Sequence, residues 1–149
     1  MKTSLIKRTV IWLGAAVVVA GLSAAAPGTA QAEPLKVGFV YVGPVGDHGW
    51  TYRHDEGRKA IDKAFGDKVQ TTLVESVKEG ADAERVIRQL AASGHKLIFT
   101  TSFGFMNPTL KVAKNFPDVR FEHATGYKQS ANVATYGARF YEGRHIAGL

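Results

Sequence analysis

Residues 35–42 read LKVGFVYV, an almost continuously apolar run rich in β-branched and aromatic residues. Such a run is typical of a strand buried on both faces of a parallel sheet. Residues 43–49 (GPVGDHG) follow as a glycine-rich loop with Asp47 as a candidate helix cap, and residues 50–65 repeat apolar side chains at helical spacing. The apolar positions of this predicted helix are Ala60, Ile61, Ala64 and Phe65. Strand, loop and helix in this order begin a βαβ unit.

The same alternation continues along the chain. Further strands are predicted at residues 69–77, 96–101, 119–123 and 132–136, and further helices at residues 82–93, from Asn107 and from Tyr141. Gly94 is placed to end the helix before it, while Asn107 and Pro108 suit the N-cap and first position of the next. Because strand and helix alternate every roughly 25–30 residues, the chain is predicted to be α/β, with a doubly wound parallel sheet.

Residues 1–32 carry the pattern of a cleavable signal peptide. Basic residues come first: Lys2, Lys7 and Arg8. An apolar run (IWLGAAVVVAGL, residues 11–22) and a small-x-small sequence (AQA, residues 30–32) follow. A transmembrane anchor is the alternative, but the run is shorter than the ~20 residues that span a bilayer. The mature chain is predicted to begin near Glu33 and to be released into the periplasm.

Charge and cysteine content exclude several classes of protein. Residues 1–32 hold three of the 19 basic residues and none of the 13 acidic ones, so the mature balance is 16 against 13, or +3. These charges are interspersed, which argues against a nucleic-acid partner. The sequence has no cysteine. That excludes disulfides, thiolate metal sites and cysteine nucleophiles, and it removes the usual attachment point of a lipid anchor.

The chain stops at residues 145–149 (HIAGL), inside an apolar helical pattern with no cap or stop signal. It is therefore expected to be truncated, with residues 33–149 forming the N-terminal lobe of a longer protein. In a doubly wound sheet, ligands bind outside the carboxyl ends of the strands. The loops predicted to meet there are residues 43–51, 101–107, 124–131 and 137–142.

Trp50 is the most informative residue of these loops. It starts a helix directly after the glycine-rich loop, where its face could stack on a flat ligand. The alternative is a tryptophan packed under the loop as part of the core. After the third strand, Phe103 or Phe105 is expected to line the same cleft, with backbone amides around Gly104 available to polar ligand atoms. Both phenylalanines could instead lie in the core.

Catalytic and cofactor motifs are absent from the sequence. The loop glycines are spaced G-x-x-G-x-x-G, which is not the dinucleotide fingerprint, and there is no phosphate-binding loop. No G-x-S-x-G or H-E-x-x-H occurs, and the five histidines include no metal-binding pair at i,i+4. Residues 53–58 are interpreted as a solvated helix face. The chain is predicted to be no enzyme and to bind neither a cofactor nor a metal.

Three segments together resemble the basic membrane protein family of substrate-binding proteins. They are KVGFVYVGPVGDHGWT from residue 36, GFMNP with VAKNFPDVRF between residues 104 and 121, and NVATY with YEGRHIAG between residues 132 and 148. The resemblance spans the chain from Leu35 to its end. It implies the first lobe of a two-lobed type I periplasmic binding protein that serves an ABC importer. Several members take up purine nucleosides or nucleobases.

The resemblance also implies site residues. The family sequence Asp-x-x-Phe-Asn, whose aromatic stacks on the ligand base, matches Asp47, Trp50 and Thr51 here. Threonine in place of asparagine favours a bare base over a nucleoside. The implied partners are a small purine-like ligand and an inner-membrane permease. Three alternatives stay open: a receptor for a sugar or another polar solute, a nucleoside-processing enzyme, and, disfavoured by the export signal, a DNA-binding regulator.

Overall fold

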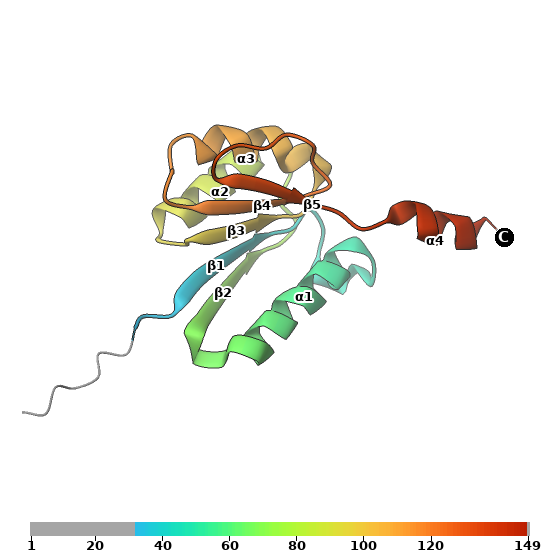
Figure 1. Ribbon diagram of the computed structural model, residues 1–149, viewed down its shortest axis with the longest axis horizontal. Helices are drawn as coiled ribbons and strands as arrows, with labels where there is room; N and C mark the ends of the chain where they lie inside the picture. The colour runs from blue at the N-terminus through green and yellow to red at the C-terminus, as the bar shows by residue number, and fades with distance from the viewer. Residues whose placement is uncertain (1–31, 149) are drawn as a thin grey trace, which may run out of the picture. The chain divides into compact units, whose positions relative to one another are not determined.

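A computed structural model of the chain describes residues 32–148, so the predicted signal peptide lies outside the described residues except for Ala32. Five strands form one sheet in the order β2-β1-β3-β4-β5, and all four neighbouring pairs are parallel (Figure 1). The strands are β1 (Leu35–Val40), β2 (Val69–Val74), β3 (Leu97–Thr100), β4 (Arg120–Ala124) and β5 (Val133–Tyr136). The predicted doubly wound α/β fold is confirmed.

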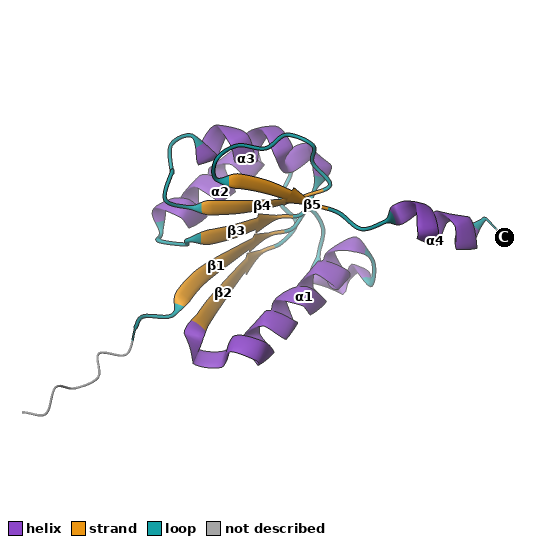
Figure 2. Ribbon diagram, viewed as in Figure 1, coloured by secondary structure: helices purple, strands orange, loops and turns teal. Residues whose placement is uncertain are grey.

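Helices lie on both faces of this sheet (Figure 2). α1 (Trp50–Phe65) covers one face, and α2 (Ala81–Ala92) and α3 (Met106–Ala113) pack together on the other. The chain leaves β1 through α1 to reach β2, then returns through α2 on the opposite face to β3. This change of direction places a topological switch point between the carboxyl ends of β1 and β3. No helix within residues 32–148 is long and apolar enough to cross a bilayer.

The larger core lies on the α2–α3 side of the sheet. The predicted apolar face of α2 is buried at Val86, Ile87, Leu90 and Ala91. These side chains pack with Ile98 of β3 and Phe121 of β4 in one continuous cluster. Gly94, with φ of +91°, takes the left-handed conformation just after α2, as a glycine at a helix end should.

The fully buried residues of α1 are polar, contrary to the sequence-based expectation, although Ile61 packs against Val37, Phe39 and Tyr41 of the sheet. Ala60, Ala64 and Phe65 stay exposed and Ile61 is half-buried, whereas the buried residues of α1 are Thr51 and Asp55. The interpretation of residues 53–58 as a solvated face is therefore wrong for Asp55, whose side chain is only 3 % exposed, and for Arg58 at 16 %. The burial of the Asp55 carboxylate is possible because Arg58 and Lys59 both bind it.

The Asp55–Arg58 pair ties α1 to the sheet. Arg58 Nε donates to Asp55 Oδ1 at 2.6 Å, and Arg58 Nη1 donates to Asp62 Oδ2 and to Thr71 Oγ1 of β2. Lys59 Nζ lies 2.9 Å from the other carboxylate oxygen of Asp55. Burial alone raises the pKa of Asp55, but the hydrogen bonds from Arg58 and Lys59 outweigh it, and the pKa falls below its usual 3.8.

Several element ends differ from the prediction, among them the end of β1, which stops at Val40 rather than residue 42, and two others have a clear structural cause. β2 stops at Val74 rather than residue 77, because Ser76 adopts a left-handed backbone with φ of +57°, which a strand cannot include. α3 begins at Met106, after a 3₁₀ turn at Phe103–Phe105, so Asn107 is not its N-cap. The amide oxygen of Asn107 instead accepts a hydrogen bond from Lys128 Nζ at 3.1 Å. Pro108 still falls in the first turn, where its missing N–H costs nothing.

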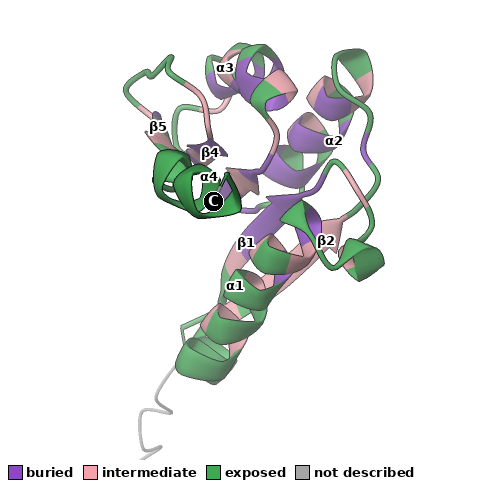
Figure 3. Ribbon diagram, turned by 90° about the vertical axis from the view of Figure 1, so that its right-hand side faces the viewer, coloured by how far each residue is buried: buried purple, intermediate pink, exposed green. Residues whose placement is uncertain are grey.

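The last helix, α4 (Phe140–Ala147), follows β5 and is exposed along its whole length (Figure 3). Its predicted start at Tyr141 is one residue late. Phe140 at its first turn lies near the Trp50 ring, with centroids 5.9 Å apart.

Candidate ligand-binding site

The switch point between β1 and β3 is bridged by Trp50. Its indole Nε1–H donates to the backbone carbonyl of Thr101, directly after β3, although Trp50 itself starts α1 after the β1 loop. The side chain remains 37 % exposed. Trp50 is therefore neither core filler nor a freely rotating surface residue, because its ring is fixed at one edge while part of its surface faces solvent.

Asp47 fixes the start of α1 behind this ring. Its Oδ1 accepts hydrogen bonds from the backbone amides of Gly49 (2.8 Å) and Tyr52 (3.0 Å), and its Oδ2 accepts one from Thr51 (3.1 Å). The Gly49 amide, with those of Tyr52 and Thr51, lowers the pKa of the carboxyl. The sequence-based expectation of a cap is confirmed, although Asp47 bonds from two residues before the N-cap position, Gly49.

Thr51 lies beneath the loop rather than facing the cleft. It is fully buried, and its hydroxyl accepts a hydrogen bond from the Gly43 amide at 3.3 Å. A Cβ added to Gly43 would lie 3.2 Å from this hydroxyl oxygen, so the glycine lets the loop approach α1 closely. Of the three residues matched to the family motif, Thr51 is buried and Asp47, although exposed, uses both carboxylate oxygens to hold the backbone, so Trp50 is the one whose side chain is left to contact a ligand.

An aromatic hollow continues behind Trp50. The His54 ring meets the Trp50 ring edge-on, with centroids 4.5 Å apart, and approaches Tyr136 of β5 at 6.3 Å. Burial lowers the pKa of His54. His54 and Tyr136, with Phe39, Phe99 and Thr101, border a hollow of about 200 Å³ on the α1 side of the sheet. His54 was not predicted as a site residue, and its neighbours in sequence gave no signal for it.

Phe103 and Phe105 have opposite fates. Phe103 is 57 % exposed at the carboxyl edge of the sheet, whereas Phe105 is completely buried in the main core. Phe103 lies beside Tyr127, with ring centroids 6.3 Å apart. The neighbouring Gly104 N–H donates to the carboxylate of Glu79 at 3.2 Å. That amide is therefore already occupied by the protein.

The loop after β4 closes over a buried histidine. His123 is fully buried, its Nδ1 lies 3.2 Å from the Thr100 carbonyl oxygen, and burial lowers its pKa. Gly126 packs directly on the imidazole, and a Cβ at this position would overlap the ring. Thr125 adopts φ of +67° to turn the chain there. Tyr127, 71 % exposed, is thereby brought to Phe103.

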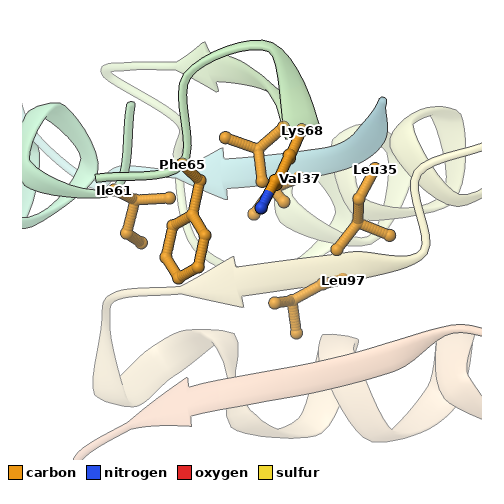
Figure 4. A pocket seen from close by; sticks show the side chains of 7 residues that line it. Leu35, Val37, Ile61, Phe65, Lys68 and Leu97 are labelled. Atoms are coloured by element: carbon orange, nitrogen blue, oxygen red, sulfur yellow. The ribbon is translucent and has the colours of Figure 1, made fainter. Parts of the chain in front are cut away.

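Another hollow, of about 330 Å³, lies at the opposite end of the sheet (Figure 4). Leu35 and Val37 of β1, Leu97 of β3 and the end of α1 form its apolar wall, with Lys68 as the one charged lining residue. It lies at the amino-terminal ends of the strands, away from the switch point, and its lining offers little hydrogen-bonding specificity. Among residues 32–148, no three His, Asp or Glu side chains are grouped as metal ligands.

Comparison with known proteins identifies the family of this chain. Residues 35–149 match the family model described as ABC transporter substrate-binding protein PnrA-like. The chain belongs to this PnrA-like family. The resemblance drawn from the loop sequences is confirmed. The family consists of transport proteins that bind substrates.

Two relatives are similar over most of this chain. A purine-binding protein of Brucella abortus is 64% identical over 123 residues, which cover 82% of this chain and 35% of the relative. A protein of Haloferax volcanii, TsgA13, whose name assigns it tentative glucose binding in an ABC transporter, is 40% identical over 121 residues, covering 81% of this chain and 30% of the relative. The chain thus spans about a third of the length of these relatives.

Solved structures agree with the fold. A solute-binding protein of an ABC transporter from Conexibacter woesei superposes with a TM-score of 0.59 at 27% identity, covering 69% of this chain and 35% of that one. A solute-binding protein from Aeropyrum pernix superposes with a TM-score of 0.67 at 23% identity, covering 77% and 31%. The second likeness concerns the fold alone.

Proposed function

We propose that the protein is a periplasmic receptor that binds a purine nucleobase or nucleoside and delivers it to the permease of an ABC importer. The observation that carries this proposal is the Trp50 ring, fixed by Thr101 at the β1–β3 switch point with part of its surface free. Aromatic stacking on a base contributes about 1–3 kcal/mol. Membership of the PnrA-like family and the similarity to a purine-binding protein support the same ligand class.

Within this proposal the predicted site residues divide into two roles. Trp50 and Phe103 contact the ligand, because both present free aromatic surface at the carboxyl edge. Asp47 and Thr51 act as positioning residues, since their polar atoms hold the backbone around the start of α1. Gly104 gives the Glu79 carboxylate room to approach the loop.

A sugar receptor is the second candidate. Aromatic faces also stack on pyranose rings, and the name of the Haloferax relative assigns glucose to that protein. The greater identity to the purine-binding relative, 64% against 40%, favours the purine.

The full-length protein is expected to bind a purine and return it unchanged. Isothermal titration with adenine, hypoxanthine, guanosine and glucose distinguishes the two receptor proposals, and chromatography after incubation detects any turnover. Binding of glucose alone would replace the purine with a sugar. Release of free base and sugar from guanosine would contradict the receptor reading and favour a nucleoside-processing enzyme.

Export is expected to remove residues 1–32. In a bacterial host, N-terminal sequencing of the full-length protein should give Glu33, and osmotic shock should release the protein with the periplasmic fraction. A protein that keeps Met1 and sediments with membranes would instead indicate an anchor. A matched variant that replaces Ala30 and Ala32 with bulky residues should accumulate uncleaved.

A further inference from the structure

The loop between β2 and α2, residues 75–80, places an acidic side chain against each of the two loops that meet at the switch point. Glu75 Oε2 accepts a hydrogen bond from the Val45 amide at 2.7 Å, in the loop after β1. Glu79 Oε1 accepts from Ser102 Oγ at 2.5 Å and from the Gly104 amide at 3.2 Å, in the loop after β3. The two carboxylates therefore bracket the site from a loop that contributes no aromatic to it.

The contact with Glu79 is built into the β3 loop. Its two donors flank Phe103, so the carboxylate holds the backbone on both sides of the exposed ring. A Cβ on Gly104 would overlap the carboxylate, which means that glycine is the residue that permits this approach. The backbone of Gly104 does not have a positive φ, so steric room for Glu79 is the reason for glycine here.

The β2–α2 loop is also fixed to the sheet by its own backbone. The Ser76 amide donates to the Gly43 carbonyl at 3.2 Å, and the Val77 amide donates to the Tyr41 carbonyl at 3.0 Å. Val77 is buried in the main core. Glu75 and Glu79 thus extend from a segment that is held in place, and hydrogen bonds to a carboxylate are shorter and stronger than neutral ones.

We propose that Glu79 is a positioning residue for ligand binding: it fixes the 102–104 backbone so that Phe103 faces the ligand beside Tyr127, while Glu75 does the same for the loop that precedes Trp50. This inference rests on the proposed function, because it assigns Phe103 to the ligand. Neither glutamate touches the ligand in this arrangement. Their effect is on the spacing of the two loops.

The test compares Glu79→Ala with Glu79→Gln in the full-length protein. Glutamine keeps a carbonyl oxygen that can accept from Ser102 and Gly104. We expect Glu79→Ala to weaken adenine binding about tenfold and Glu79→Gln by less than about threefold, with little change in melting temperature for either. Asp67→Ala is the matched control, since this exposed carboxylate lies in the turn between α1 and β2, at the opposite end of the sheet.

A double-mutant cycle makes the test sharper. Gly104→Ala should weaken adenine binding in the wild-type background, because its methyl group displaces the Glu79 carboxylate. In the Glu79→Ala background the same change should cost much less, since the overlapping group is gone. Three results would each overturn the proposal. Gly104→Ala could lower the adenine affinity equally in both backgrounds, Glu79→Ala could leave the affinity unchanged, or Glu79→Gln could bind as weakly as Glu79→Ala.

Failure of the positioning role of Glu79 and failure of the proposed function are distinguishable. Amide hydrogen exchange of the peptide that contains Ser102–Gly104 is measured without ligand, and it should be faster in Glu79→Ala and restored in Glu79→Gln. If the wild-type protein binds no purine, the proposed function fails and the exchange data alone decide whether Glu79 holds this loop. Unchanged hydrogen exchange in Glu79→Ala overturns the positioning role of Glu79, whichever ligand the protein binds.

Discussion

Trp50→Ala is expected to lower the affinity for a purine about ten- to hundredfold, which corresponds to the loss of about 1–3 kcal/mol of stacking. Trp50→Phe should lose less, because a flat face remains. It will not reach the wild-type affinity, since phenylalanine cannot donate to the Thr101 carbonyl as the indole does. Calorimetric titration of the full-length protein with adenine measures both variants.

The melting temperature without ligand separates this role from a core role. Truncation of a buried tryptophan costs about 3–5 kcal/mol of stability. Trp50 is 37 % exposed, so its loss should cost less, although its contact with the His54 ring adds some stability. Weak binding of adenine together with a nearly unchanged melting temperature supports Trp50 as the ring that stacks on the ligand. If the variant folds and its affinity is unchanged, Trp50 is not part of the binding site. A large fall in melting temperature would show that Trp50 is a structural residue.

Asp55→Ala is expected to lower the free energy of unfolding by about 3 kcal/mol. Breaking a buried ion pair leaves the partner charge uncompensated, and the cost here falls at the low end of the usual range because Arg58 keeps Asp62. Urea denaturation at pH 7 measures the change. Glu56→Ala is the control: Glu56 pairs with Arg53 on the exposed side of the same helix, and its loss should cost less than about 1 kcal/mol.

The contribution of Asp55 should also depend on pH. Its pKa is lower in the folded protein than the usual 3.8, so the unfolded chain binds a proton more readily. The stabilisation is therefore present above about pH 4 and is lost as the pH falls through the folded pKa. The difference in unfolding free energy between wild type and Asp55→Ala should shrink from pH 7 to pH 3. A gap that stays constant across this range would contradict the assignment.

The sequence was enough to predict the elements that have a local signal. The α1 boundaries at Trp50 and Phe65 follow from the glycines on either side, and the apolar face of α2 follows from its periodicity. The position of Trp50 at the switch point needs only the element order and the parallel sheet. These features depend on neighbours in sequence, so a single chain reveals them.

Other features depend on partners far along the chain. Asp55 lies in a polar stretch, and only the packing of α1 against β2, where Arg58 of the same helix also donates to Thr71, shows that it is buried. Glu79 meets Ser102 across 23 residues because α2 carries the chain over the sheet. The sequence alone could not show which of Phe103 and Phe105 is buried. A 3₁₀ turn advances about 120° per residue, so it points the two side chains in different directions.

The hydrogen bonds of Asp47 also bear on which purines could be accepted. A free helix N-terminus attracts phosphate, because its unpaired amides point outward. At the start of α1, three of these amides already bind an ionised carboxylate. A phosphate monoester brought to this end would meet a negative charge and no free donor from those three residues. Under the proposed function, we expect the cap to select against nucleotides and to leave uncharged bases and nucleosides as the compatible ligands at this helix end.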